Sequence, residues 1–140
     1  MALKASQLSV GDSREQILTD NLTRTQIVMY AGASGDYNPL HSDEVYTTQV
    51  AGYPSVFAHG MLTMGMTGRA LTDWVGDGRL LAYGVRFSKQ VWPGDALTAL
   101  VTITAIRDLD GTPVADLAVA TRNQKGEDVV IGIATARLDP

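Results

Sequence analysis

An aspartate and a histidine lie five residues apart in the segment Tyr30–His41, which reads YAGASGDYNPLH. Asp36 and His41 carry side chains that take up and release protons near neutral pH, so together they indicate acid–base chemistry. Residues five apart do not share a helix face, and on a strand they point to opposite faces. The two can meet only on an irregular backbone, which Asn38-Pro39 supplies because Pro39 fixes its own φ and disfavours a helical Asn38. We predict a loop here, with a catalytic pair in it.

A helix is predicted to lead into this loop. Thr23 and Gln26 have the spacing of a capping box, in which the Thr23 hydroxyl accepts from the amide of Gln26 and the Gln26 side chain reaches back to the cap. The helix should end near Gly32 or Gly35, because glycine readily adopts the left-handed conformation that stops a helix. It would deliver the chain to Asp36.

A second short helix is expected directly after His41. Ser42 can cap its first turn, since a serine oxygen accepts from the unpaired amides of a helix start. Val45, Tyr46 and Val50 would then pack inward.

The segment Ala58–Val75 has the length of a helix and is apolar nearly all round, which is typical of a buried helix. Gly65 and Gly68 each cost about 1 kcal/mol relative to alanine inside a helix. We therefore expect the close approach of a sheet to compensate at these positions. Gly76-Asp77-Gly78 should end the helix.

The rest of the sequence is typical of strands joined by short turns. Apolar residues alternate in Leu81–Phe87 and Leu97–Ile103, and two further runs cover Val114–Thr121 and Val129–Leu138. Ile17–Leu22 is predicted as a short first strand or an extended lead-in. Strands joined by short turns are antiparallel, and one apolar sheet face against one helix makes a two-layer α+β domain. The simplest architecture is a curved antiparallel sheet wrapped round a central buried helix.

Composition limits the class of protein. A chain of 140 residues fits one domain, predicted to span residues 1–140, and the lack of cysteine excludes disulfides and thiolate metal sites. The net charge is −4 and the 11 basic residues are scattered, so we expect no nucleic-acid partner. Without a long apolar run or a charged leader, we predict a cytoplasmic protein with no membrane span. We expect no cofactor.

Two motifs together resemble a known family. Gly35–His41 has the form GDxNPxH, and Ala58–Leu62, which reads AHGML, follows further along the chain. With Val85–Phe87 and Pro93–Asp95, they resemble the MaoC-like family of (R)-specific enoyl-thioester hydratases and 3-hydroxyacyl-thioester dehydratases. The resemblance extends from about Leu22 to the last residue.

The resemblance implies a hot-dog fold, an acyl thioester of CoA or acyl carrier protein as substrate, and a role in fatty-acid metabolism. It also implies dimerisation through sheet edges, as a homodimer or with a related hot-dog subunit. Asp36 and His41 would form the catalytic pair. Asn38 would orient the loop at the substrate, and the Gly60 amide would hold the thioester oxygen. Some members have a supporting serine at the position of Gly68.

The residues themselves are compatible with that chemistry. Adding water across an enoyl thioester needs proton exchange at one water molecule and a donor for the charge on the carbonyl oxygen, and an amide in the first turn of a helix is such a donor. Apolar residues near that turn are acyl-channel candidates, and methionine adapts to variable chains. The candidates are Val56, Phe57, Met61 and Met64.

Several of these residues also have plainer interpretations. Asp36 and His41 could simply satisfy loop hydrogen bonds, and His59 is interpreted as a structural hydrogen bonder beside a helix start. No metal site is predicted, because neither of the two histidines has a helical partner at ligand spacing. Three basic side chains either meet phosphates of CoA or a carrier protein, or form a solvated face paired with acids: Arg79, Arg86 and Lys89.

Two rival functions remain at this point. A hot-dog thioesterase would attack the thioester carbonyl and release a free thiol. Alternatively, the chain may be one subunit of a heteromeric dehydratase, or chiefly position a carrier protein. Because it retains both Asp36 and His41, we expect it to be the catalytic half of any such pair.

Overall fold

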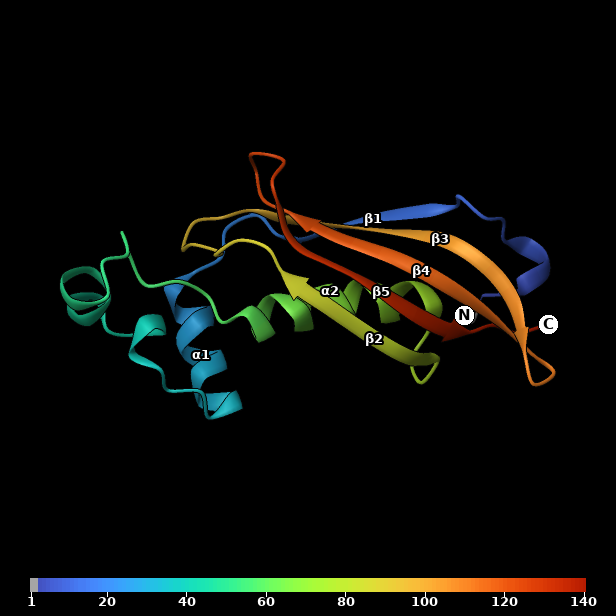
Figure 1. The fold of residues 1–140 in the computed structure, drawn as a ribbon, viewed down its shortest axis with the longest axis horizontal. Helices are drawn as coiled ribbons and strands as arrows, with labels where there is room; N and C mark the ends of the chain where they lie inside the picture. Colours follow the sequence, from blue (N-terminus) through green and yellow to red (C-terminus); the bar gives the residue numbers. More distant parts are fainter. Residues whose placement is uncertain (1–2) are drawn as a thin grey trace.

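Five antiparallel strands form one curved sheet over the helix α2 in this computed structural model, which describes residues 3–140 (Figure 1). The order across the sheet is β1-β3-β4-β5-β2, so β1 and β2 are the edges. The strands are β1 (Ser13–Thr19), β2 (Leu80–Phe87), β3 (Leu97–Leu109), β4 (Thr112–Arg122) and β5 (Asp128–Arg137). The expected α+β architecture is confirmed. The expected bounds of the first strand, Ile17–Leu22, were wrong, because pairing with β3 begins earlier, at Ser13.

The alternation in β3 produces the predicted two-sided strand. Leu97, Ala99, Val101 and Ile103 are all buried and face the helix. The pattern in β2 is less regular, because a bulge next to Leu81 leaves that side chain half exposed. Edge strands commonly contain such bulges, which disturb the strict inward and outward alternation.

The helix α2 runs from Gly60 to Val75, so it ends as predicted but begins two residues after the predicted Ala58, and it is not buried all round. Leu71 and Val75 pack into the main core under β3, β4 and β5. The opposite face is exposed and carries a stripe at four-residue spacing: Met61, Gly65, Arg69 and Asp73. The prediction of complete burial was wrong because, within residues 3–140, a single sheet covers only one side of the helix.

The two glycines inside α2 have different surroundings. A Cβ on Gly68 would lie 3.2 Å from the Tyr83 ring, so the expected close approach of the sheet is confirmed there. A Cβ on Gly65 would meet no described atom within 4 Å, so the same expectation was wrong for Gly65. Tyr83 thus packs beside Gly68, the position at which the resemblance implies a serine in some family members.

The segment from Leu22 to Ala58 projects beyond the end of the sheet (Figure 1). It contains the helix α1 (Arg24–Ser34), a 3₁₀ helix at Pro39–His41 and a short π-helical turn at Tyr46–Val50. A second apolar cluster fastens this projection to the sheet. Its members are Leu22, Ile27, Ala58, Val91, Leu97, Val129 and Val130.

The short helix after His41 differs from its prediction. Asp43 rather than Ser42 caps it, because the Asp43 carboxylate accepts from the Tyr46 amide at 3.0 Å. Val45, Tyr46 and Val50 were expected to face inward, but all three are exposed. The sheet does not extend over this end of the projection (Figure 1), so within the described residues it cannot cover these side chains.

The capping box at the start of α1 predicts a measurable stability difference. Thr23 accepts from the Gln26 amide at 3.1 Å and Gln26 accepts from the Thr23 amide at 2.9 Å, as expected. Thr23→Ala should lower the free energy of unfolding by about 1 kcal/mol in urea denaturation. Thr25→Ala is the matched control, because Thr25 is an exposed helical residue and alanine is the better helix former. Equal effects of the two substitutions would contradict a capping role.

Candidate active site

The loop that carries Asp36 is built from local hydrogen bonds. Gly35 ends α1 in the left-handed conformation, with φ of 74°, and turns the chain out of the helix. The Asn38 amide then donates to Asp36 Oδ1 at 3.2 Å, while Asn38 Oδ1 accepts from the Leu40 amide at 3.0 Å. Asn38 thus lies in a turn held by its own amide and side chain, and its role at the substrate stays a prediction. Side-chain-to-backbone turns of this kind are what Asp and Asn favour outside helices.

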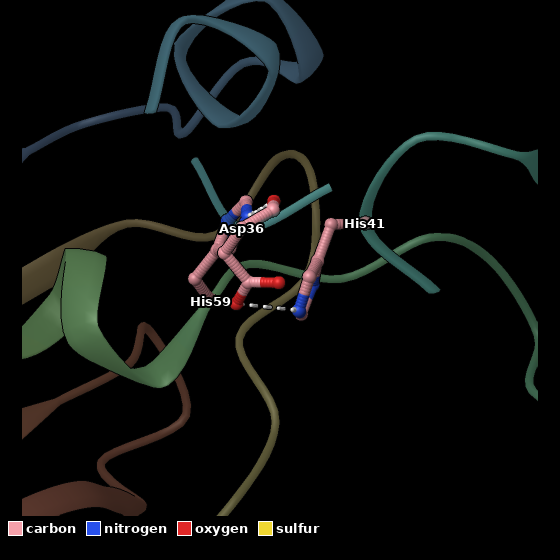
Figure 2. A group of neighbouring side chains, drawn as sticks. All are labelled: Asp36, His41 and His59. Carbon is pink, nitrogen blue, oxygen red and sulfur yellow. Dashed lines mark hydrogen bonds and ion pairs between the residues drawn. The ribbon is translucent and has the colours of Figure 1, made fainter. Parts of the chain in front are cut away.

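His41 is fixed by one strong hydrogen bond. Its Nδ1 lies 2.7 Å from the Phe57 carbonyl oxygen, and since a carbonyl only accepts, Nδ1 carries the proton. The other nitrogen, Nε2, keeps its lone pair and faces Asp36 Oδ2 at 4.0 Å (Figure 2). The structure thus brings the two predicted side chains together across a gap.

The gap between Asp36 Oδ2 and His41 Nε2 has the size of one water molecule. A water oxygen about 2.8 Å from each atom would make an angle of about 90° between them, close to the angle between the two O–H bonds of water. Both atoms can accept a hydrogen bond, so such a water would donate to each. Its oxygen lone pairs would then point away from the pair.

The environments of the two side chains differ. The His41 side chain is 10% exposed and that of Asp36 is 52% exposed. Burial lowers the pKa of His41, an effect that the neighbouring His59 reinforces; the bond to Phe57 and the charge of Asp36 partly oppose it. Burial disfavours a charged imidazole, so His41 is held in its neutral, proton-accepting form.

His59 is a member of this site that sequence reasoning placed outside it. Its Nε2 lies 3.0 Å from the Asp36 carbonyl oxygen, and its ring stacks on that of His41 with centroids 3.8 Å apart (Figure 2). A histidine in the AHGML motif was a visible signal. Nothing in the sequence signalled its contact with the loop 23 residues earlier, because such contacts depend on tertiary packing.

Stacking argues against these three side chains as a metal centre. Their ligand atoms lie within 4.8 Å of one another. A metal bound to imidazole lies in the ring plane about 2 Å from the nitrogen. The rings of His41 and His59 are stacked, with planes 25° apart and centroids 3.8 Å apart. One metal ion therefore cannot lie in both ring planes and also be about 2 Å from a nitrogen of each ring.

A cavity of about 240 Å³ lies beside the start of α2 and the end of β2. It is lined by Phe57, Ala58, Gly60, Thr63, Phe87, Ser88, Lys89, Gln90, Val91, Val129 and Val130. Two of the predicted site residues, Phe57 and Gly60, therefore border it. Asp36 and His41 are outside this lining within residues 3–140, so convergence of the pair and the Gly60 amide on one space stays a prediction.

Gly60 has the free amide that its predicted role requires. It is the first residue of α2, and its N–H has no hydrogen-bond acceptor in the described part of the chain. An unpaired amide with the helix dipole behind it stabilises negative charge. However, a Cβ on Gly60 would lie 2.8 Å from the Phe87 ring. The absence of a Cβ at Gly60 therefore leaves room for the Phe87 ring, which would otherwise have to move.

The other predicted site residues lie around this centre. Val56 is buried, Met64 is half buried, and Met61 is exposed on the outward face of α2. None of the three lines the cavity, so their acyl-channel role stays a prediction within the residues described.

The three basic side chains considered for phosphate binding are also placed. Arg79 pairs with Asp139, and Lys89 pairs with Glu127 at 2.7 Å. Arg86 forms no ion pair within residues 3–140 and is exposed on the edge strand β2. Two of the three are thus engaged with acids, as the plainer reading expected.

Comparison with known proteins identifies the family. Residues 5–124 match the model of the MaoC-like domain. The chain is 40% identical over 85 residues to 3-hydroxyacyl-thioester dehydratase Y of Mycobacterium tuberculosis, covering 59% of this chain and 29% of that protein. It is 30% identical over 141 residues to the (R)-specific enoyl-CoA hydratase of Aeromonas caviae, covering 97% of this chain and 99% of that one. The chain therefore spans under a third of the first relative and nearly all of the second.

Solved structures confirm the hot-dog fold. The (R)-hydratase from A. caviae, described as involved in PHA biosynthesis, superimposes with a TM-score of 0.83 at 29% identity, covering 96% of this chain and 99% of that chain. A chain from the ChsH1-ChsH2 complex of M. tuberculosis superimposes with a TM-score of 0.79 at 25% identity, covering 93% and 98%. Hot-dog chains similar to this one therefore occur in complexes of two different subunits.

No helix within the described residues is both long enough and apolar enough to cross a bilayer.

The contact between Gly60 and Phe87 predicts a coupled stability effect. Gly60→Ala should destabilise the protein, because overpacking against a ring typically costs about 1–3 kcal/mol. In a Phe87→Ala background the same substitution should cost nothing, giving a coupling of about 0.5–3 kcal/mol in a double-mutant cycle by urea denaturation.

Gly65→Ala is the matched control in the same helix. A Cβ there meets no described atom within 4 Å, so it should stabilise the protein by up to about 1 kcal/mol. Additive effects of the substitutions at Gly60 and Phe87 would refute the contact.

Proposed function

The chain belongs to the MaoC-like family, and from this premise we propose that it hydrates 2-enoyl thioesters with (R) specificity, or dehydrates 3-hydroxyacyl thioesters in the reverse direction. The observation that supports this most is the placement of His41 Nε2 opposite Asp36 Oδ2 at 4.0 Å, with the proton of His41 held on Nδ1. The relative that matches this chain over nearly its full length is named for the same reaction.

In the proposed reaction one water molecule donates to both Asp36 Oδ2 and His41 Nε2. His41 takes a proton from this water as its oxygen bonds to C3 of the substrate, and the double-bond electrons move towards the thioester carbonyl. His41 then transfers this proton to C2. Because the oxygen and the proton reach the substrate from the same place, addition is syn.

The charge that develops on the thioester oxygen needs a donor already in position. In our proposal the Gly60 N–H is that donor, because it opens α2 and is unpaired among the described residues. Removing such a donor typically costs about 10²–10³ in rate. Phe57 and Gly60 border the cavity of about 240 Å³, which we propose as the start of the acyl channel, with Val56, Met61 and Met64 nearby.

We also propose that this chain binds a second hot-dog subunit. The Asp36 side chain is 52% exposed in the single chain, whereas acid–base chemistry of this kind benefits from exclusion of bulk water. The edge strands β1 and β2 offer unpaired backbone groups, and an exposed edge favours pairing with another chain. We propose a homodimer or a heterodimer with a related subunit, acting on CoA or carrier-protein thioesters in the cytoplasm, with residues 1–140 as one domain.

Two substitutions test the catalytic pair. Asp36→Asn and His41→Ala should each lower kcat/KM for crotonyl-CoA hydration by about 10²–10⁴, because the first removes the carboxylate that binds and orients the water and the second removes the base that takes its proton. Hydration is followed by the loss of absorbance of the conjugated thioester, and circular dichroism checks that both variants fold. Near-normal rates in either variant would exclude the proposed mechanism.

A thiol trap in the same assay separates this reaction from thioester hydrolysis, which releases a thiol where hydration releases none. If the purified chain is inactive and a related subunit restores activity, the active form is the heteromer.

The lowered pKa of His41 predicts the pH dependence of the reaction. The neutral form that accepts the proton should persist below the ordinary histidine pKa of about 6.5. Consequently kcat/KM should stay constant as pH falls through about 6.5 and decline only at lower pH. A pH–rate profile of the wild-type protein measures this, and an acid limb centred above the ordinary value would contradict the assignment of His41 as the base.

A further inference from the structure

His59 contacts both members of the pair through different parts of one side chain. Its Nε2–H donates to the Asp36 carbonyl at 3.0 Å, which fixes the backbone that carries the carboxylate. Its ring stacks on His41 with centroids 3.8 Å apart and planes 25° apart. The side chain of His41 therefore lies against His59 on one face while its Nδ1 is bound to Phe57.

The ring of His59 is itself held on its other side. Tyr30 from α1 packs edge-on against it with centroids 4.8 Å apart and planes 63° apart. The residue is 2% exposed, so it has little freedom to rotate. Tyr30, His59 and His41 thus form a row of three rings that ends at the catalytic nitrogen, with Asp36 beside it.

Helix capping does not account for His59. It occupies the N-cap of α2, but its side chain makes no capping hydrogen bond to the described helix. Its Nδ1 is buried and has no partner within residues 3–140. An unpaired buried acceptor costs stability, so a purely structural position would favour serine, threonine or aspartate, which cap helices well.

We propose that His59 is the positioning residue of the pair, which holds the Asp36 main chain through its Nε2–H and the ring of His41 through stacking. This inference rests on the proposed hydratase function. It adds to that function a third residue, His59, which sets the distance between Asp36 Oδ2 and His41 Nε2.

The stack also restricts where a proton can be held. The titratable groups that face His41 are Asp36 and His59, and Tyr30 follows behind His59. His59 carries its proton on Nε2, which donates to the Asp36 carbonyl, and its buried Nδ1 has no partner within residues 3–140. Of the two His41 nitrogens, Nδ1 is bound to the Phe57 carbonyl, so Nε2, which faces Asp36, is the one that can exchange a proton at the site.

Two substitutions divide the functions of His59. His59→Gln keeps an N–H donor at about the reach of Nε2 and loses the ring, whereas His59→Phe keeps a ring and loses the donor. Each should lower kcat for crotonyl-CoA by about 10–100-fold, because small displacements of reacting groups cost this much, with KM changed by less than about threefold. Tyr30→Phe is the matched control and should retain near-normal kcat, since it keeps the ring that packs on His59.

Imidazole NMR gives a readout that a merely structural role would not move. The chain contains only two histidines, so each His59 variant leaves a single imidazole signal, that of His41. In the wild type His41 should show the proton on Nδ1. In His59→Gln its titration midpoint should rise, because the neighbouring imidazole is removed.

The outcomes separate the two levels of the proposal. A wild-type protein that does not hydrate crotonyl-CoA, alone or with a related subunit, overturns the proposed function. An active wild type together with normal kcat and an unchanged His41 titration in both folded variants overturns the positioning role. If both variants fail to fold, a wild-type spectrum with the His41 proton on Nε2, or with exchanging tautomers, overturns it as well.

Discussion

The hydrogen bond from His41 Nδ1 to the Phe57 carbonyl is the interaction on which the site depends. It joins a loop after α1 to the segment that starts α2, and so connects two parts of the chain that the sequence separates. It also decides which nitrogen of His41 holds the proton, since the carbonyl can only accept. Without this bond His41 would be free to present either nitrogen, and the gap to Asp36 would have no fixed width.

That bond in turn needs a rigid projection to hold it. The projection contains no strand among its described residues, and the second apolar cluster holds it against the sheet. A group of hydrogen bonds to Glu44, which we call the clasp, holds it together as well. In the clasp Glu44 accepts from Arg24 at 2.7 Å and from the Val56 amide at 3.2 Å. These hydrogen bonds lower the pKa of Glu44, which favours the ionised carboxylate that both donors bind. It ties the start of α1 to the residue preceding Phe57, which keeps the acceptor of His41 in place.

The sequence allowed prediction of those features that depend on neighbouring residues. The capping box at Thr23 and the turn at Asn38-Pro39 are set by local hydrogen bonds, and the burial pattern of β3 by simple alternation. The pairing of Asp36 with His41 followed from the motif and its family resemblance. Local patterns could not reveal that His59 stacks on His41, or that Phe87 fills the space at Gly60, because both contacts join distant elements.

The fit between Gly60 and Phe87 constrains how such a protein can evolve. Since a Cβ at position 60 and a ring at position 87 would claim the same volume, the two positions are not independent. A lineage that acquires a larger residue at one must accept a smaller one at the other, either in the same step or through a destabilised intermediate. Residue 60 opens the helix whose amide we assign to the thioester oxygen, and residue 87 ends an edge strand. Co-variation between them would therefore couple changes at the sheet edge, where we propose that a second subunit binds, to the inheritance of catalytic competence.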